Sequence, residues 1–129
     1  MRPPKNPLTG QELEIMKVVW RLESATVRQV YETLLEKRQI AYTTVMTMMK
    51  ILETKGFLKK RQDERAFVYT PAQPQKQVVG SMVREFVNRV FNGSAEPLLL
   101  HLVEDQHLTG QDLEEIRKTI RDTRKKGER

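Results

Sequence analysis

Apolar residues recur every three or four positions along the first 55 residues, and this spacing predicts three amphipathic helices. The first follows Thr9 and the second follows Thr26, and each threonine has a Glu or Gln three residues later, as in a capping box. The third runs from about residue 41 to residue 55 and ends before Gly56, a residue suited to a helix C-terminus. The predicted buried positions are Leu13, Met16, Val19, Trp20, Val27, Val30, Tyr31, Leu34, Val45, Met48, Met49 and Leu52.

After Gly56 the hydrophobic pattern changes, and residues 57–61 and 66–70 read as two short strands around a turn at 62–65. Three helices followed by a β-hairpin, with a short joint between the second and third helix, is the order of a winged helix-turn-helix. Pro71 and Pro74 end this unit because proline stops regular structure. The sequence therefore predicts a winged helix-turn-helix domain over residues 1–72.

Residues 73–129 are predicted to form three further helices, at about 75–91, from Pro97 to about 104, and after Thr109. The last one opens with residues 108–113, which nearly repeat residues 8–13, and we interpret this as independent use of one capping signal. About 57 residues enclose little core on their own, so we interpret this region as a dimerisation module. The alternative is that it packs back on the first domain. The predicted dimerisation residues are Val79, Met82, Val83, Phe86, Val90, Leu99, Leu102, Leu113, Ile116 and Ile120.

The expected fold class is therefore mainly α with a small β-hairpin, a winged helix-turn-helix plus a C-terminal helical dimerisation region. No apolar run reaches the roughly 18 residues of a membrane span, and the N-terminus lacks the apolar core of a signal peptide. The absence of cysteine excludes disulfides and thiolate metal sites and fits a cytoplasmic location. We expect no membrane insertion.

Catalytic chemistry has little support in the sequence. The two histidines, His101 and His107, have no Ser/His/Asp arrangement and no glycine-rich phosphate loop beside them. A metal site built from them would need Glu104 or Asp105 as a partner, and solvated histidines are the simpler interpretation. We therefore predict a protein that is not an enzyme and that carries no metal and no cofactor.

Positive charge is concentrated beside the third helix. The chain has a formal net charge of +6, and residues 37–65 hold eight basic against three acidic residues. A local basic patch indicates a polyanionic partner, although a solvated lysine-rich surface has the same composition.

The third helix exposes threonines where a surface helix usually carries Glu and Lys. Thr43, Thr47, Lys50 and Thr54 share the face opposite the apolar stripe, at a cost of a few tenths of a kcal/mol per threonine in helix propensity. Threonine is short and uncharged, its hydroxyl can reach phosphates or base edges, and its methyl can pack on thymine. We therefore predict that this helix enters the major groove of double-stranded DNA. The predicted base-contacting residues are Thr43, Thr44, Met46 and Thr47, and the predicted phosphate-contacting residues are Arg28, Tyr42, Lys50, Lys59, Lys60, Arg61 and Arg65. The alternative is a winged-helix protein-interaction module whose Thr/Lys face docks an acidic protein.

The stretches TVRQVYETL (26–34) and AYTTVMTMMKILETKGFLKKRQDERAFVYTP (41–71) resemble the penicillinase repressor family (BlaI/MecI/CopY type) of bacterial transcriptional repressors. Residues 13–20 share the resemblance, and LLLHLVEDQHLTGQDLEEI (98–116) continues it more weakly. The resemblance implies an N-terminal winged helix that binds palindromic operators and a C-terminal region that holds a homodimer. In β-lactam-responsive members it also implies relief by a regulatory protease that cuts the C-terminal region, here at His101 and Leu102. We therefore expect repression to be relieved by such proteolysis or by another signal that acts on the C-terminal region.

This chain departs from the family pattern at three places. It has His101 and Leu102 where the β-lactam members carry an amide residue followed by an aromatic one. It lacks the C-terminal cysteines of copper-responsive members, which excludes copper sensing by that route. At the hairpin tip, Asp63-Glu64 precede Arg65 where a glycine is common, so either Glu64 weakens phosphate contact or Asp63 takes the positive-φ position.

Overall fold

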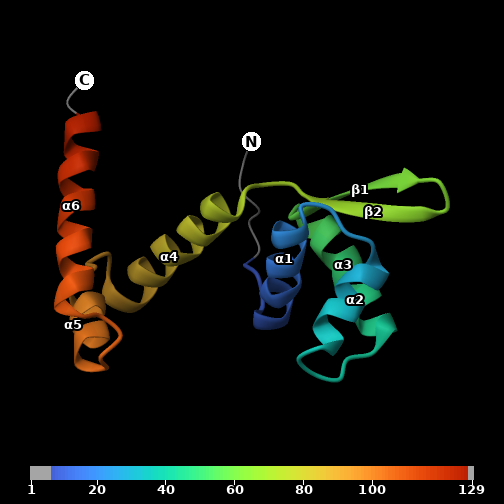
Figure 1. Cartoon of the computed structure of the whole chain (residues 1–129), viewed down its shortest axis with the longest axis horizontal. Helices are drawn as coiled ribbons and strands as arrows, with labels where there is room; N and C mark the ends of the chain where they lie inside the picture. Colours follow the sequence, from blue (N-terminus) through green and yellow to red (C-terminus); the bar gives the residue numbers. More distant parts are fainter. Residues whose placement is uncertain (1–6, 128–129) are drawn as a thin grey trace. The chain divides into compact units, whose positions relative to one another are not determined.

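The computed structural model describes residues 7–127, with side chains as far as Arg124. Within that range it contains six helices and one two-stranded antiparallel hairpin (Figure 1). In chain order the elements are α1 (Gly10–Leu22), α2 (Val27–Leu35), α3 (Tyr42–Lys55), β1 (Leu58–Asp63), β2 (Ala66–Pro71), α4 (Gln75–Phe91), α5 (Glu96–Glu104) and α6 (Gly110–Gly127). The predicted fold class, mainly α with a small β-hairpin in winged helix-turn-helix order, is confirmed.

The chain divides into two compact units, one ending at Met82 and the other beginning at Val83. The division lies within α4, ten residues after the boundary predicted at residue 72. Val78 in the first half of α4 is buried in the core of the first unit, and Met82 packs against that core. The first half of α4 therefore belongs structurally to the winged helix.

The core of the first unit is built by α1, α2, α3 and the base of the hairpin. Fully burying a large aliphatic side chain contributes about 1.5–3 kcal/mol, so these residues dominate the stability of the unit. The buried apolar residues are Ile15, Met16, Val18, Val19, Ala25, Val30, Leu34, Val45, Met49, Leu52, Phe57, Leu58, Tyr69 and Val78. The indole N–H of Trp20 donates to the carbonyl of Gln73 at 3.1 Å and so connects α1 to the chain leaving the hairpin.

Both predicted capping boxes at the start of α1 and α2 are present. The Thr9 hydroxyl accepts from the backbone N–H of Glu12 at 3.2 Å, and the Glu12 carboxylate accepts from the N–H of Thr9 at 2.8 Å. Thr26 and Gln29 exchange the same pair of bonds at 3.1 and 2.8 Å. Each cap stabilises its helix by about 1 kcal/mol, which explains why these starting points were readable from the sequence.

The hairpin is longer than predicted, because β1 continues to Asp63, which pairs directly with Ala66. Only Glu64 and Arg65 remain in the turn, and Glu64 has φ +55°. The expectation that Asp63 takes the positive-φ position is wrong, since Asp63 lies in the strand ladder. Ala25, between α1 and α2, adds a bridge to Tyr69 with backbone hydrogen bonds of 2.8 and 2.9 Å, and this bridge holds the hairpin to the helices.

The second unit holds the end of α4 together with α5 and α6. Asn92 and Gly93 end α4, with φ values of +54° and +88°. Phe91 contacts the ring of Phe86 edge-on, with centroids 5.9 Å apart, and lies 6.0 Å from the ring of His101 in α5. Within residues 7–127, no helix combines the length and the apolar content needed to cross a membrane.

Candidate nucleic-acid interface

Helix α3 presents the threonine face that the sequence predicted. Val45, Met49 and Leu52 are buried, while the side chains of Thr43 and Thr47 are exposed. Thr44 and Lys50 are also exposed, and Met46 is half-buried at the flank. The helix ends at Gly56, whose φ of +90° lies in the left-handed region, as its position predicted. A rigid helix therefore carries short, uncharged hydroxyl groups on its solvent side.

A small aromatic and cationic cluster joins the N-terminal ends of α2 and α3. The guanidinium of Arg28 lies 6.0 Å from the centroid of the Tyr42 ring, and Tyr31 meets Tyr42 edge-on with centroids 5.4 Å apart. Arg28 also makes an exposed ion pair with Glu32 at 3.5 Å. The structure thus brings together two residues, Arg28 and Tyr42, that were predicted separately as phosphate contacts.

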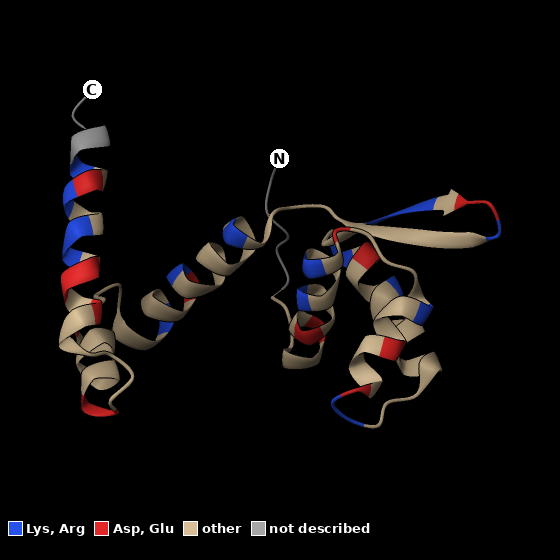
Figure 2. Cartoon of the chain, in the orientation of Figure 1, with Lys and Arg blue, Asp and Glu red and all other residues tan. Residues whose placement is uncertain are grey.

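The hairpin carries the predicted basic residues along β1 and at its tip (Figure 2). Side chains alternate between the two faces of a strand, so Lys59 and Arg61 share one face and Lys60 lies on the other. Arg65 occupies the turn. The four basic residues therefore do not form one continuous surface, contrary to what their adjacency in the sequence suggests.

Lys60 has two contacts within the first unit. Its ammonium lies 3.6 Å from the carboxylate of Glu53 in α3 and 4.4 Å from the centroid of the Phe67 ring. Neither contact was visible in the sequence, because both depend on how β1 packs against α3 and β2. Lys60 therefore connects the hairpin to α3, whereas Lys59 is exposed on the other face of β1.

The turn residue Glu64 supports a prediction about the hairpin. Glu64→Gln is expected to raise affinity for duplex DNA about threefold at low salt, because it removes one of the two negative charges beside Arg65 at the hairpin tip, and to lose this gain at high salt. Glu64→Asn is expected to raise affinity equally and also to increase the free energy of unfolding by about 0.5–1 kcal/mol relative to the Gln variant, since Asn tolerates positive φ. Salt-dependent DNA titrations and thermal unfolding measure the two effects. Weaker DNA binding by both variants would contradict a role for the hairpin tip beside phosphates.

A buried ion pair that the sequence did not reveal fixes α1 to α3. The carboxylate of Glu12 accepts from the ammonium of Lys55 and from the backbone N–H of Thr9, both at 2.8 Å. The Glu12 side chain is only 5% exposed. Burial alone raises the pKa of Glu12, but the hydrogen bonds from Lys55 and Thr9 and the charge of Lys55 outweigh it, so the pKa lies below its ordinary value of 4.5.

Glu12→Gln is therefore expected to lower the free energy of unfolding by about 1.5–3 kcal/mol near neutral pH. Glutamine still accepts the capping hydrogen bond from Thr9, so the loss reports the ion pair with Lys55. Because the folded pKa is depressed, the stabilisation is present above pH 4.5 and is lost as the pH falls through the folded pKa. Denaturant titrations of both proteins between pH 7 and pH 3 measure this difference.

Glu14→Gln serves as the control for this ion pair. Glu14 binds Arg38 at 2.8 Å, but both side chains are about one-third exposed, so we expect a change below about 1 kcal/mol. Equal losses in the two variants, or a difference that persists at pH 3, would contradict the assignment.

The two histidines do not gather further ligands. Among the described residues, no three His, Asp or Glu side chains form a group suited to a metal ion. His101 lies in α5 against Phe91, and His107 lies in the loop before α6.

Comparison with known proteins agrees with this arrangement. The model of the penicillinase repressor family matches residues 8–122. A penicillinase repressor of Bacillus licheniformis is 30% identical over 109 residues, covering 84% of this chain and 85% of the relative. Transcriptional regulator BlaI of Mycobacterium tuberculosis is 39% identical over 95 residues, covering 72% of this chain and 69% of the relative.

Among solved structures, a similar one is the solution structure of monomeric Bacillus licheniformis BlaI in complex with the blaP half-operator. It has a TM-score of 0.50 and 32% sequence identity, and the match covers 59% of this chain and 92% of that chain. Because the family match spans most of the sequence, this chain belongs to the penicillinase repressor family.

Proposed function

We propose that this chain is a bacterial transcriptional repressor that binds duplex DNA with α3 in the major groove and the hairpin on the flanking phosphates. The observation that carries the proposal is the exposed threonine face of α3, with Arg28 near its N-terminal end and the basic hairpin packed beside it. Threonine reads base edges without the indiscriminate attraction of lysine, and the cations hold the DNA backbone. The relatives named above are a repressor and a regulator rather than enzymes, and one solved relative binds a half-operator.

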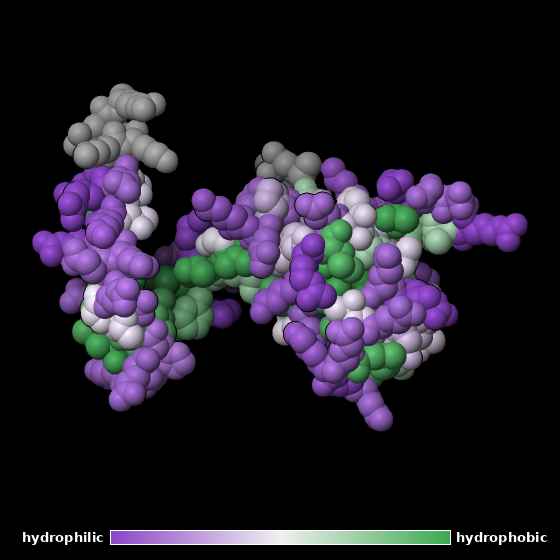
Figure 3. Space-filling view, viewed as in Figure 1, coloured by the Kyte–Doolittle hydropathy of each residue, from purple (hydrophilic) through white to green (hydrophobic). Residues whose placement is uncertain are grey.

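Dimerisation through the second unit is part of the proposal. Soluble monomers rarely expose large contiguous apolar patches, yet this unit exposes many large apolar side chains (Figure 3). Nine of the ten predicted dimerisation residues remain candidates for the interface, while Met82 packs against the core of the first unit and is left out. The exposed members of the set in the second unit are Val83, Phe86, Val90, Leu99, Leu113, Ile116 and Ile120, and Val79 is exposed in the part of α4 that belongs to the first unit.

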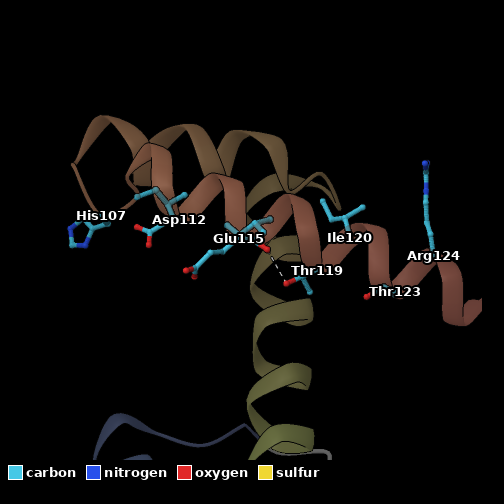
Figure 4. Close-up of a pocket in the computed structure, with 9 residues that line it drawn as sticks. His107, Asp112, Glu115, Thr119, Ile120, Thr123 and Arg124 are labelled. Carbon is cyan, nitrogen blue, oxygen red and sulfur yellow. Dashed lines mark hydrogen bonds between the residues drawn. The ribbon is translucent and has the colours of Figure 1, made fainter.

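The side of α6 offers a groove for such an interface. A cavity of about 730 Å³ runs along the helix, and its walls include Leu108, Ile116 and Ile120. Figure 4 shows Ile120 among the polar residues that line the same side of α6. Polar residues such as Asp112 and Glu115 border the apolar positions. An apolar centre with a polar rim is typical of interfaces between proteins. We propose that the second subunit covers this groove and that a two-fold dimer accounts for binding to a palindrome.

We also propose that a protease relieves repression by cutting the chain between His101 and Leu102, two residues of α5. The bond between these residues lies inside the helix, where the carbonyl of His101 accepts from the N–H of Asp105 at 3.0 Å. Proteolysis concentrates in exposed, poorly ordered segments. Cleavage here therefore requires α5 to unwind first, so the inducing signal would act on the stability of this helix.

Selection from a pool of randomised duplexes tests the proposed function. We expect an enriched palindrome whose half-sites are about one helical turn apart, with binding that weakens steeply as salt increases. A pool without an enriched palindrome would contradict the repressor. Tight binding to an acidic protein but not to DNA would instead support the interaction module.

A further inference from the structure

A groove at the edge of the predicted interface runs between α3 and the start of α1. It has a volume of about 450 Å³ and lies between the first turn of α1 and the exposed side of α3. Thr9, the N-cap of α1, and Gln11 in its first turn line one side of the groove, and Thr43, Thr44 and Thr47 of α3 line the other. The polar side chains of α1 and the predicted base-contacting threonines therefore share one surface.

The groove and the hairpin lie on opposite sides of α3. Lys60 of β1 contacts Glu53, so the hairpin borders the side of α3 that carries Glu53. Thr44 is nine residues earlier, or about two and a half helical turns, and so projects from the opposite side. A helix in the major groove lies between two phosphate backbones. Elements on its two sides therefore face different DNA strands.

Gln11 lies on a part of α1 that the next residue, Glu12, fixes in place. The ion pair between Glu12 and Lys55, at 2.8 Å, fixes the first turn of α1 to the C-terminal end of α3. Gln11 itself is exposed, and its carboxamide carries N–H donors. A side-chain donor of this kind, on a rigid element beside the recognition helix, suits a phosphate oxygen.

We propose that Gln11 donates a hydrogen bond to a DNA phosphate on the strand opposite the one contacted by the hairpin. This inference rests on the proposed function, since it assumes that α3 enters the major groove. It adds a residue of α1 to an interface otherwise made by α2, α3 and the hairpin. Gln11 would fix the register of the protein on the duplex without reading base sequence.

The chain contains a matched control for this proposal. Residues 108–113 repeat the capping sequence of residues 8–13 except that Asp112 stands at the position of Glu12, and Gln111 stands at the position of Gln11. The bonds between Thr109 and Asp112, at 2.9 and 3.1 Å, show that the same cap forms at α6. Gln111 lies in the second unit, so the same substitution there changes the net charge equally without altering the groove beside α3.

The experiment compares full-length Gln11→Ala, Gln11→Lys, Gln111→Ala and Gln111→Lys in titrations with the selected palindrome and with base-substituted versions. Gln11→Ala is expected to weaken binding about fivefold for all these sequences, with an unchanged salt slope because no charge is lost. Gln11→Lys is expected to bind more tightly at low salt and to steepen the slope of log K against log salt by about 0.9 per subunit, as one more phosphate is neutralised. The Gln111 variants are expected to match the wild type, and thermal unfolding confirms that all four are folded.

Equal slopes for Gln11→Lys and Gln111→Lys would overturn the inference. A changed base preference in Gln11→Ala would also overturn it, by making Gln11 a base reader. In both cases the proposed function survives as long as the wild type still binds its palindrome. A wild-type protein without salt-dependent binding to DNA would contradict both the inference about Gln11 and the proposed function.

Discussion

Ile120→Glu is expected to convert the protein into a monomer and to weaken its binding to a palindromic operator by a factor of roughly 10²–10⁴. The Ile120 side chain is 56% exposed in the single chain, so glutamate there leaves the fold of the chain intact. In the proposed dimer it would place a charge in an apolar contact, which is costly without a partner. Two linked half-site contacts bind far more tightly than one, and the expected factor reflects the loss of that linkage.

Sedimentation analysis and titration with the whole palindrome and with one half-site measure this effect. Binding to the half-site is expected to stay unchanged, because α3 and the hairpin lie in the other unit. Gln111→Glu adds the same charge to α6 at a position that lies, by helical projection, on the side opposite Ile120, and it should remain a dimer. A dimeric Ile120→Glu protein, or a wild type that is monomeric at high concentration, would contradict dimerisation through α6.

Thr47→Ala is expected to relax base preference at one position in each half-site. Thr47 is exposed in the middle of the threonine face and borders the groove shared with α1. A single hydrogen bond from a hydroxyl to a base edge is worth about 0.5–1.5 kcal/mol, so the preference should fall roughly 2- to 13-fold at that position. Alanine has higher helix propensity than threonine, so α3 itself should not be destabilised. Repeating the selection with the variant measures the change.

Lys59→Ala is the companion variant for Thr47→Ala. It should lower affinity evenly across sequences and reduce the salt slope by about 0.9 per subunit, because lysine contacts phosphate rather than bases. Lys60→Ala is a less direct probe of phosphate binding, since it also removes the contacts with Glu53 and Phe67. Equal changes in base preference from Thr47→Ala and Lys59→Ala would contradict the division between base and phosphate contacts.

Local elements of this fold were readable because their signals lie within a few residues of one another. Thr9 with Glu12, and Thr26 with Gln29, define helix starts through bonds that span three residues. Gly56 marks the end of α3 through its own backbone conformation. The turn of the hairpin was less predictable, because the ladder extends to Asp63 and forces Glu64 into positive φ.

The candidate interface was readable in part. The periodicity of α3 correctly separated the exposed Thr43 and Thr47 from the buried Val45 and Met49. The role of Glu12 was only half visible, because the capping box with Thr9 is local but the partner Lys55 is 43 residues away. A contact between residues so far apart in the sequence depends on how the helices pack, and packing leaves no simple periodic signal in the sequence.

The sequence alone determined where the helices begin, which face of α3 is apolar, and that a basic hairpin follows a threonine-rich helix. These properties follow from hydrogen bonds and side-chain spacing along one short segment. Only the tertiary structure decided that Lys60 contacts Glu53 of α3, that Glu12 is buried against Lys55, and that Gln11 borders the threonine face. Those outcomes depend on the packing of segments far apart in the chain, where burial and charge act through space rather than along the sequence.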